Sequence, residues 1–233
     1  MASSPAASGP APVAILCAMA EEAAPFVAAL EGAEPVDAPL AGVEARRGAL
    51  DDRPVVIVTT GIGLVAAAAA ATWAATALGA RILVSAGSAG GLSRESRVGD
   101  VAVAESCTYG TADATEFGYE RGQVPRQPVR FAASARLVDA VPAPELRGRI
   151  LSGDTFVTAR NVADMREAFS DAVATDMEST AIAQVAHAVG AEFVSVRGVS
   201  DLCGPEAGVD FHIGVDEAAA RSFAAVRGML AAI

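Results

Sequence analysis

Carboxylates follow three of the apolar runs in this chain, at points where side chains could do chemistry. Glu21 and Glu22 come shortly after the run Val13–Cys17, Asp176-Met177-Glu178 closes a second run, and Ser200-Asp201 closes a third. Ligands of α/β proteins bind beyond the carboxyl ends of the strands. One acid at such a place usually caps a helix. Three acids at three strand ends favour a site whose chemistry is proton transfer.

Asp201 is the acid whose position is hardest to explain by capping. It closes a strongly β-branched run over 192–200, and the residues that follow include Gly204, Pro205 and Gly208, which predict a loop. No helix begins there for the Asp201 side chain to cap. We therefore interpret Asp201 as a positioned acid.

Two glycine-rich segments also follow apolar runs. We expect Gly87-Ser88-Ala89-Gly90-Gly91 to form a loop that offers successive main-chain N–H groups and one hydroxyl. Such a loop suits an anion or sugar oxygens, although a plain turn would use the same glycines. Residues 61–66 match the dinucleotide fingerprint G-x-G-x-x-A. That fingerprint needs an acid about 20 residues further on, and Arg81–Ser85 contains none. Nicotinamide and flavin cofactors are therefore not expected.

The elements that must position these residues alternate between strand and helix patterns. Alternation of this kind predicts an α/β fold, with a mixed or parallel sheet between layers of helices. We expect one domain over 13–233, preceded by a disordered tail over 1–12. The expected strands are 13–17, 43–50, 54–60, 81–85, 98–106, 149–152, 173–176 and 192–200, and the expected helices are 21–30, 64–78, 132–140, 161–169, 178–189 and 215–233.

Three local signals refine this outline. Pro25 is compatible with the first helix only in its first turn, and Gly32 is expected to stop that helix. The pair Asp51-Asp52 predicts a tight turn between two strands. The polar and aromatic stretch 107–127 is rich in turn residues, and we interpret it as a functional loop.

The charged residues exclude several classes of protein. Acidic residues outnumber basic ones 28 to 17, which gives a net charge of −11 and argues against nucleic acid or an anionic membrane as a partner. All 17 basic residues are Arg. A P-loop, a Schiff-base enzyme and a Lys general base each require Lys, so these classes are excluded.

The cysteines and histidines narrow the choice further. Cys17, Cys107 and Cys203 are widely spaced and odd in number, which is typical of reduced, buried thiols in a cytoplasmic protein. Only two His are present and no H-E-x-x-H motif occurs, so a zinc site is not expected. The longest apolar run, around Ala66–Ala71, is too short to span a bilayer.

Eight segments of the chain occur together, in this order, in one known family. They are Ala18-Met19-Ala20-Glu21-Glu22, Thr60-Gly61-Ile62-Gly63, Gly87-Ser88-Ala89-Gly90-Gly91-Leu92, Val98-Gly99-Asp100, Phe117-Gly118-Tyr119-Glu120 with Gly122-Gln123, Ser152-Gly153-Asp154-Thr155-Phe156, Asp176-Met177-Glu178-Ser179-Thr180-Ala181 and Val196-Arg197-Gly198-Val199-Ser200-Asp201. The chain thereby resembles the methylthioadenosine/S-adenosylhomocysteine nucleosidases of the purine nucleoside phosphorylase superfamily. This resemblance implies a single-domain, three-layer αβα fold with a central mixed, twisted sheet, and neither cofactor nor metal.

The resemblance also implies a reaction, the hydrolysis of the N-glycosidic bond of an adenine thio-nucleoside. That reaction passes through a cationic, oxocarbenium-like sugar. Asp201, oriented by Ser200, matches the acid that protonates purine N7, and Glu22 matches the base that activates water. Glu178 matches the carboxylate that binds the ribose hydroxyls and stabilises the cationic sugar. Each proton transfer is typically worth about 10²–10⁴-fold in rate.

The binding residues implied by the resemblance come from several segments. Phe156 and Val157 would stack on the purine and read its edge. A partner subunit supplies the Phe117 region in the family, so a homodimer is implied. The remaining substrate contacts would come from Met19, Ile62, Met177, Phe211 and Tyr119 around the ribose and its 5′-alkylthio group, and from Ser88, Ala89, Gly90, Arg197 and Ser200.

The chain departs from the family at three places. Ala20 replaces an acid that is common there, and Ser179 stands where the family usually has Ala, beside the ribose carboxylate. The loop Leu202–Asp210, which precedes Phe211, differs in composition.

The attacking species separates hydrolases from phosphorylases within the superfamily. Phosphate needs cationic ligands, usually Arg, and neither Ala18–Glu22 nor Val84-Ser85-Ala86 contains one. A carboxylate at the position of Glu22 repels phosphate and suits water. Hydrolysis of methylthioadenosine and S-adenosylhomocysteine is therefore favoured. An (amino)futalosine nucleosidase of menaquinone synthesis, a purine nucleoside phosphorylase and a non-catalytic nucleoside-binding module remain the alternatives.

Overall fold

Four parallel strands form the centre of the sheet in the computed structural model, which describes residues 10–204 and 213–233. They are β1 (Val13–Cys17), β4 (Arg53–Thr59), β5 (Ile82–Gly91) and β10 (Glu192–Asp201). All five residues of β1 are buried, because β4 and β5 flank it and helices cover both faces. Such burial explains why these strands read as continuous apolar runs. The expected tail over 1–12 lies almost wholly outside the described residues.

The sheet closes partly on itself, which the sequence did not predict. Its ten strands run in the order β10-β6-β8-β9-β5-β1-β4-β3-β2, with β7 (Phe131–Ala132) beside β6 and with β10 also paired to β5. The ring therefore consists of β5 and β10 with β6 (Val101–Tyr109), β8 (Leu146–Ser152) and β9 (Ala172–Asp176). The two ends of β5 make this closure possible, since its first residues pair with β1 and its last two pair with β9.

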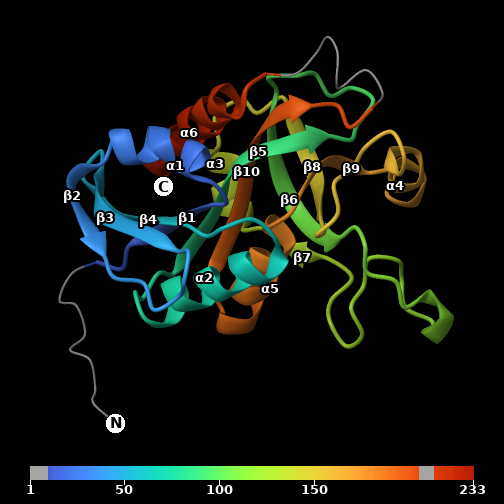
Figure 1. Cartoon of the computed structure of the whole chain (residues 1–233), viewed down its shortest axis with the longest axis horizontal. Coiled ribbons are helices and arrows are strands. Elements are labelled where there is room, and N and C mark those ends of the chain that lie inside the picture. Colours follow the sequence, from blue (N-terminus) through green and yellow to red (C-terminus); the bar gives the residue numbers. More distant parts are fainter. Residues whose placement is uncertain (1–9, 205–212) are drawn as a thin grey trace.

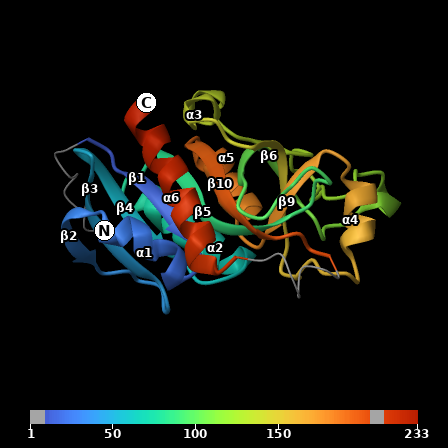
Figure 2. The same cartoon turned by 90° about the horizontal axis from the view of Figure 1, so that it is seen from above.

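Helices cover both faces of the sheet, which confirms the predicted three-layer fold class (Figures 1 and 2). Helices α1 (Ala20–Ala28), α3 (Ala135–Ala140) and α6 (Val215–Ala232) pack on one face through one apolar core, and α2 (Leu64–Thr76) and α5 (Ser179–Val189) pack on the other through a second core. In the part of the chain that the structure describes, no helix has the length and apolarity needed to cross a membrane.

The first helix ends differently from the prediction. A strand, β2 (Glu31–Val36), follows it directly and includes Gly32, and β2 pairs with β3 (Glu44–Leu50) at the edge of the sheet. Five of the six β2 residues are exposed, so the apolar alternation that identifies a strand is missing. Pro25 is the sixth residue of α1 and not part of its first turn.

The glycine-rich segment 87–91 was expected to be a loop, and that expectation was wrong. It forms the second half of β5, and its residues pair with β10 and β9. Glycine is required there because neighbouring atoms occupy the space of a side chain. A Cβ on Gly90 would lie 2.3 Å from Cys203 Sγ, and a Cβ on Gly91 would lie 2.8 Å from Ser96 Cβ.

Other predicted elements are present with shifted ends. The turn Asp51-Asp52 connects β3 and β4 with φ values of 49° and 63°, as the paired acids predicted. Helix α4 (Val162–Ala168) begins after Asn161, but the Asn161 side chain accepts a hydrogen bond from the Thr158 N–H at 2.8 Å and does not cap the helix.

The segment between β6 and β7, expected to be a functional loop, contains only a short 3₁₀ helix, Thr115–Phe117. Gly122 fixes the part of this segment that follows the 3₁₀ helix. The Gly122 N–H donates to the Ala112 carbonyl, its φ is +87°, and an added Cβ would lie 2.5 Å from Thr108 Cγ2 and 2.7 Å from the Tyr109 carbonyl oxygen. Side-chain volume is therefore excluded at this position by the strand beneath.

We predict that Gly122→Ala lowers the free energy of unfolding by about 2–4 kcal/mol, because left-handed strain adds to a clash with main-chain atoms. Gly118→Ala is the matched control. Gly118 lies in the same segment with φ +81° and has open space around its Cα, so only the strain of about 1–2 kcal/mol should appear. Urea unfolding of both variants measures the difference, and equal losses would contradict the prediction.

Candidate active site

The three acids predicted at strand ends line one pocket. This pocket has a volume of about 140 Å³ and lies beyond the carboxyl ends of β1, β5, β9 and β10. Its lining residues are Ala18, Met19, Glu22, Ile62, Ser88, Ala89, Gly90, Thr155, Phe156, Val157, Thr175, Asp176, Met177, Glu178, Ser200, Asp201 and Cys203. Neither arginine nor histidine occurs among these described lining residues.

Glu22 is buried and its carboxylate accepts four hydrogen bonds. One oxygen, Oε2, accepts the main-chain N–H groups of Ala18 at 2.9 Å and Met19 at 3.2 Å. The other, Oε1, accepts both the N–H and the hydroxyl of Ser88, each at 2.8 Å. Glu22 is the third residue of α1, so its bond to Met19 is one half of a capping box. The same side chain therefore caps a helix and reaches across to β5.

Gly87 makes room for this carboxylate. Its φ is +143°, and a Cβ there would lie 2.4 Å from Glu22 Oε1. The main-chain and side-chain donors of Ser88, which the sequence suggested for an anion or a sugar, are used to hold Glu22.

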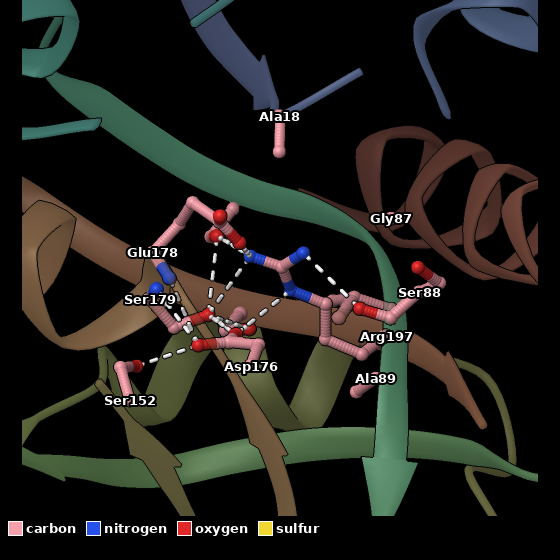
Figure 3. A network of polar contacts seen from close by, with 12 residues as sticks. Ala18, Gly87, Ser88, Ala89, Ser152, Asp176, Glu178, Ser179 and Arg197 are labelled. Atoms are coloured by element: carbon pink, nitrogen blue, oxygen red, sulfur yellow. Dashed lines mark hydrogen bonds and ion pairs between the residues drawn. The ribbon is translucent and has the colours of Figure 1, made fainter. Parts of the chain in front are cut away.

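Arg197 lies beneath the pocket, between two carboxylates (Figure 3). Its guanidinium is 3.0 Å from Asp176 Oδ2 and 3.5 Å from Glu178 Oε2, and its side chain is only 1% exposed. It also donates to the Ser88 carbonyl oxygen at 3.3 Å. Arg197 thus links β10 to β5 and to the turn between β9 and α5. Breaking a buried pair of this kind typically costs about 3–5 kcal/mol.

Glu178 is the carboxylate with the clearest electrostatic signature. Burial raises the pKa of Glu178 to about 7. The nearby Arg197 guanidinium lowers this pKa, and the Asp176 carboxylate raises it. Oε1 accepts the Gly63 N–H at 3.0 Å, so Glu178 caps the N-terminus of α2. A carboxyl group with a pKa near 7 in a pocket is typical of functional sites.

A cluster of buried hydroxyls completes the surroundings of Arg197. Ser179 donates to Asp176 Oδ2 and lies 2.7 Å from the Ser195 hydroxyl. Arg197 donates to the hydroxyl of Ser85 at 2.6 Å and to that of Ser179 at 3.2 Å. Ser179 therefore contacts the ion pair and is absent from the pocket lining.

Asp201 is held by its own turn. The Cys203 N–H donates to Oδ1 at 2.9 Å, and the Ser200 hydroxyl donates to Oδ2 at 3.0 Å. The first of these bonds is an Asx turn. No helix uses Asp201 as a cap in this part of the described chain, which agrees with the sequence analysis.

Most of the predicted site residues meet in this pocket, and three of the described ones do not. Arg197 is buried beneath it, Phe117 is 81% exposed, and Tyr119 is absent from the lining. Phe211 lies outside the described residues. The residues that do line the pocket are Met19, Glu22, Ile62, Ser88, Ala89, Gly90, Phe156, Val157, Met177, Glu178, Ser200 and Asp201.

Sequence reasoning placed Asp176 at a strand end but assigned it no role, and it missed Ala18, Thr155, Thr175 and Cys203 as lining. Asp176 accepts the N–H groups of Glu178 and Ser179, both at 3.1 Å, and so caps α5 while it pairs with Arg197. Its place two residues before Glu178 was a usable signal. Among the described residues, no group of three or more His, Cys, Asp or Glu is arranged to hold a metal ion.

Comparison with known proteins places the chain in a family. The model of the phosphorylase superfamily matches residues 12–232. The curated 5′-methylthioadenosine/S-adenosylhomocysteine nucleosidase of Staphylococcus aureus (strain bovine RF122 / ET3-1) is 38% identical over 199 residues, which are 82% of this chain and 87% of that protein.

Solved structures show the same relationship. The nucleosidase of Neisseria meningitidis in complex with methylthio-immucillin-A superposes with a TM-score of 0.90, 34% identity and coverage of 96% of this chain and 100% of that one. The nucleosidase of Colwellia psychrerythraea 34H in complex with adenine superposes with a TM-score of 0.88 and 35% identity, and the match covers 94% of this chain and 94% of that one. The chain thus belongs to the 5′-methylthioadenosine/S-adenosylhomocysteine nucleosidases of the phosphorylase superfamily.

Proposed function

We propose that this chain hydrolyses 5′-methylthioadenosine and S-adenosylhomocysteine, with water as the nucleophile and with adenine and the 5-thio-ribose as products. The observation that carries the assignment of roles is the meeting of Glu22, Glu178 and Asp201 in one pocket. Family membership supports the reaction. The bound molecules named for the related structures, adenine and methylthio-immucillin-A, support the substrate class.

Glu22 is proposed as the base that takes a proton from water. Its four accepted hydrogen bonds occupy all the lone-pair sites of a carboxylate. One of the donors must therefore yield before Glu22 accepts another proton. The Ser88 hydroxyl can rotate, whereas the main-chain N–H groups cannot, so Ser88 is the donor that exchanges its partner for the attacking water.

Asp201 is proposed as the acid that protonates N7 of the departing purine. The Asx turn and the Ser200 hydroxyl fix the plane of its carboxyl group before substrate arrives. Phe156, which is 78% exposed in this structure, and Val157 line the same pocket and are proposed to contact the purine. Such preorganisation lets proton transfer occur without rearrangement of the site.

Glu178 is proposed to bind the ribose hydroxyls and to stabilise positive charge on the sugar. Arg197 offsets part of the negative charge of Asp176 and Glu178, but Glu22 adds a third buried carboxylate. The cluster therefore holds more acidic than basic groups. It favours a cationic sugar and disfavours phosphate, which needs cationic ligands in contact with it.

A homodimer is proposed on the face formed by α2. This helix contains no charged residue, and Val65 on it is 80% exposed. A groove of about 880 Å³ runs beside α2 and is lined mainly by apolar residues, including Leu40, Leu64 and Tyr109. A second copy seated here would cover the groove, and its Phe117 is proposed to reach the 5′ end of the substrate. A cytoplasmic location is also proposed, supported by three free, buried cysteines.

We predict that Asp201→Asn and Glu22→Gln each lower the rate of adenine release from methylthioadenosine by at least about 10²-fold, because each removes a proton-transfer group. Circular dichroism should show an unchanged fold. Glu22→Gln should also lose about 1–3 kcal/mol of stability, since an amide cannot accept all four hydrogen bonds. Glu21→Gln, an exposed neighbour, is the control and should keep full activity.

The same assay separates the rival reactions. Adenine release from methylthioadenosine, S-adenosylhomocysteine and aminofutalosine is measured with and without phosphate. Release independent of phosphate is expected for hydrolysis. Formation of a ribose 1-phosphate product would contradict it, and turnover of aminofutalosine alone would identify the other nucleosidase class.

We predict that kcat/KM falls as the pH drops below about 7, because protonation of Glu178 removes the carboxylate that accepts the ribose hydroxyls. The folded state should be affected in the opposite sense. A folded pKa of about 7 against 4.5 for the free side chain means that the folded protein binds a proton that the unfolded chain releases. Glu178 thus contributes stability below about 4.5 that is lost as the pH rises through about 7.

Wild type and Glu178→Gln can be compared by thermal unfolding between pH 5 and pH 8, two values that bracket most of this window. The stability of wild type relative to the variant should decrease as the pH rises. A constant difference across the window would show that the Glu178 carboxyl titrates at its ordinary pKa.

We predict that Val65→Asp converts the dimer to a monomer, since it places a charge in the centre of an apolar interface. Sedimentation velocity gives the mass, and the KM for methylthioadenosine should rise when the partner's loop is lost. Ala28→Asp, which adds the same charge at the exposed end of α1, should leave the mass and the KM unchanged. A fully active wild-type monomer would refute the proposed interface.

A further inference from the structure

Arg166 joins the ends of two strands that line the pocket, β5 and β10. It lies on α4, which sits beside the ends of β5 and β10 (Figures 1 and 2). Its Nε donates to the Leu92 carbonyl oxygen at 2.8 Å, and its Nη2 donates to the Leu202 carbonyl oxygen at 3.1 Å. Leu92 directly follows β5 and Leu202 directly follows Asp201, so one side chain holds both strand ends.

The end of β10 needs such support because its regular pairing is interrupted there. The register between β10 and β5 shifts between Val199 and Asp201, and Asp201 then lies opposite Gly90. The turn beyond it packs closely on β5, since the Cys203 Sγ would be 2.3 Å from a Cβ on Gly90. The Leu202 carbonyl lies in the middle of this turn.

The carboxyl group of Asp201 depends on the same turn. Its Oδ1 accepts the N–H of Cys203, the residue after Leu202, and its Oδ2 accepts the Ser200 hydroxyl. A shift of the Leu202 carbonyl therefore moves a hydrogen-bond donor of Asp201. Arg166 does not line the pocket, and any effect on the reaction must pass through this turn.

The type of residue fits this task. A guanidinium presents several N–H groups in a rigid fork, so one side chain can bind two carbonyls at once, whereas a Lys ammonium is a single point charge. Among the described residues, no carboxylate lies within ion-pair distance of Arg166. Within the described residues, its guanidinium thus hydrogen-bonds to the carbonyl oxygens of Leu92 and Leu202.

We propose that Arg166 is a positioning residue for the general acid: it fixes the turn after β10 so that Asp201 points at the leaving purine. This inference rests on the role proposed above for Asp201. It assigns Arg166 to the departure of the base and not to the activation of water, which is proposed for Glu22.

The leaving group provides the test. Arg166→Met and Arg166→Lys are assayed on methylthioadenosine and on the 4-nitrophenyl riboside of the same 5-methylthio-ribose, whose nitrophenolate leaves without a proton. Arg166→Met should lower kcat on methylthioadenosine about ten- to a hundredfold, a part of the about 10²–10⁴-fold that a positioned acid contributes. The kcat of Arg166→Lys on methylthioadenosine should lie between those of wild type and Arg166→Met. Activity on the nitrophenyl riboside should change less than about twofold, because no proton transfer from Asp201 is needed.

Two comparison variants make the result decisive. Arg53→Met removes another guanidinium that binds a main-chain carbonyl, that of Ile233 at 2.7 Å, and should leave both activities unchanged. Asp201→Asn should lower kcat on methylthioadenosine more than Arg166→Met does, and it should likewise spare activity on the nitrophenyl riboside. Equal losses on both substrates in Arg166→Met would show a general structural role and overturn the inference. If Asp201→Asn itself kept its activity on methylthioadenosine, the proposed role of Asp201 would fail instead.

A double mutant gives a second measurement that does not depend on the nitrophenyl substrate. Residues that act as a unit have non-additive effects. Adding Arg166→Met to Asp201→Asn should therefore lower the residual rate of adenine release by less than about twofold. Full multiplication of the two single losses would mean that Arg166 acts independently of Asp201, which contradicts the proposal.

Discussion

One buried guanidinium shared between carboxylates holds this site together. Arg197 lies within 3.0 Å of Asp176 and 3.5 Å of Glu178, and it also binds β5 through the Ser88 carbonyl. Taking a charge out of water costs several kcal/mol, so a buried Arg requires partners on all sides. The strand β10, which carries Arg197, is thereby fixed relative to β5, β9 and the start of α5, which carry its partners. The pocket above them takes its shape from that constraint.

The same constraint explains the charge of the pocket. Three buried carboxylates, those of Glu22, Asp176 and Glu178, lie near one buried cation, Arg197. Burial raises the pKa of Glu178 to about 7. The hydroxyls of Ser85 and Ser179 accept hydrogen bonds from Arg197 Nη2 without adding charge. A second Arg would have supplied the cationic ligands that phosphate needs. The observed balance suits a reaction that passes through a cationic sugar and uses water.

The sequence predicted the parts of this molecule that depend on local pattern. The buried strands, the turn at Asp51-Asp52 and the three acids at strand ends follow from apolar runs and turn chemistry. The sheet closure did not follow, because pairing between β10 and both of its neighbours depends on contacts far apart in sequence. The segment 87–91 was misinterpreted for a related reason: its glycines are dictated by Glu22 and Cys203, which pack against them from other elements.

The acids also show why capping and catalysis were not true alternatives. Glu22 caps its own helix, Asp176 caps α5, and Glu178 caps α2 through Gly63. Helix N-termini carry partial positive charge and unpaired N–H groups, so they stabilise ionised carboxylates. Each cap therefore fixes the orientation of an acid. Asp201, the proposed proton donor, is held by a turn instead, and its geometry consequently depends on whatever holds that turn.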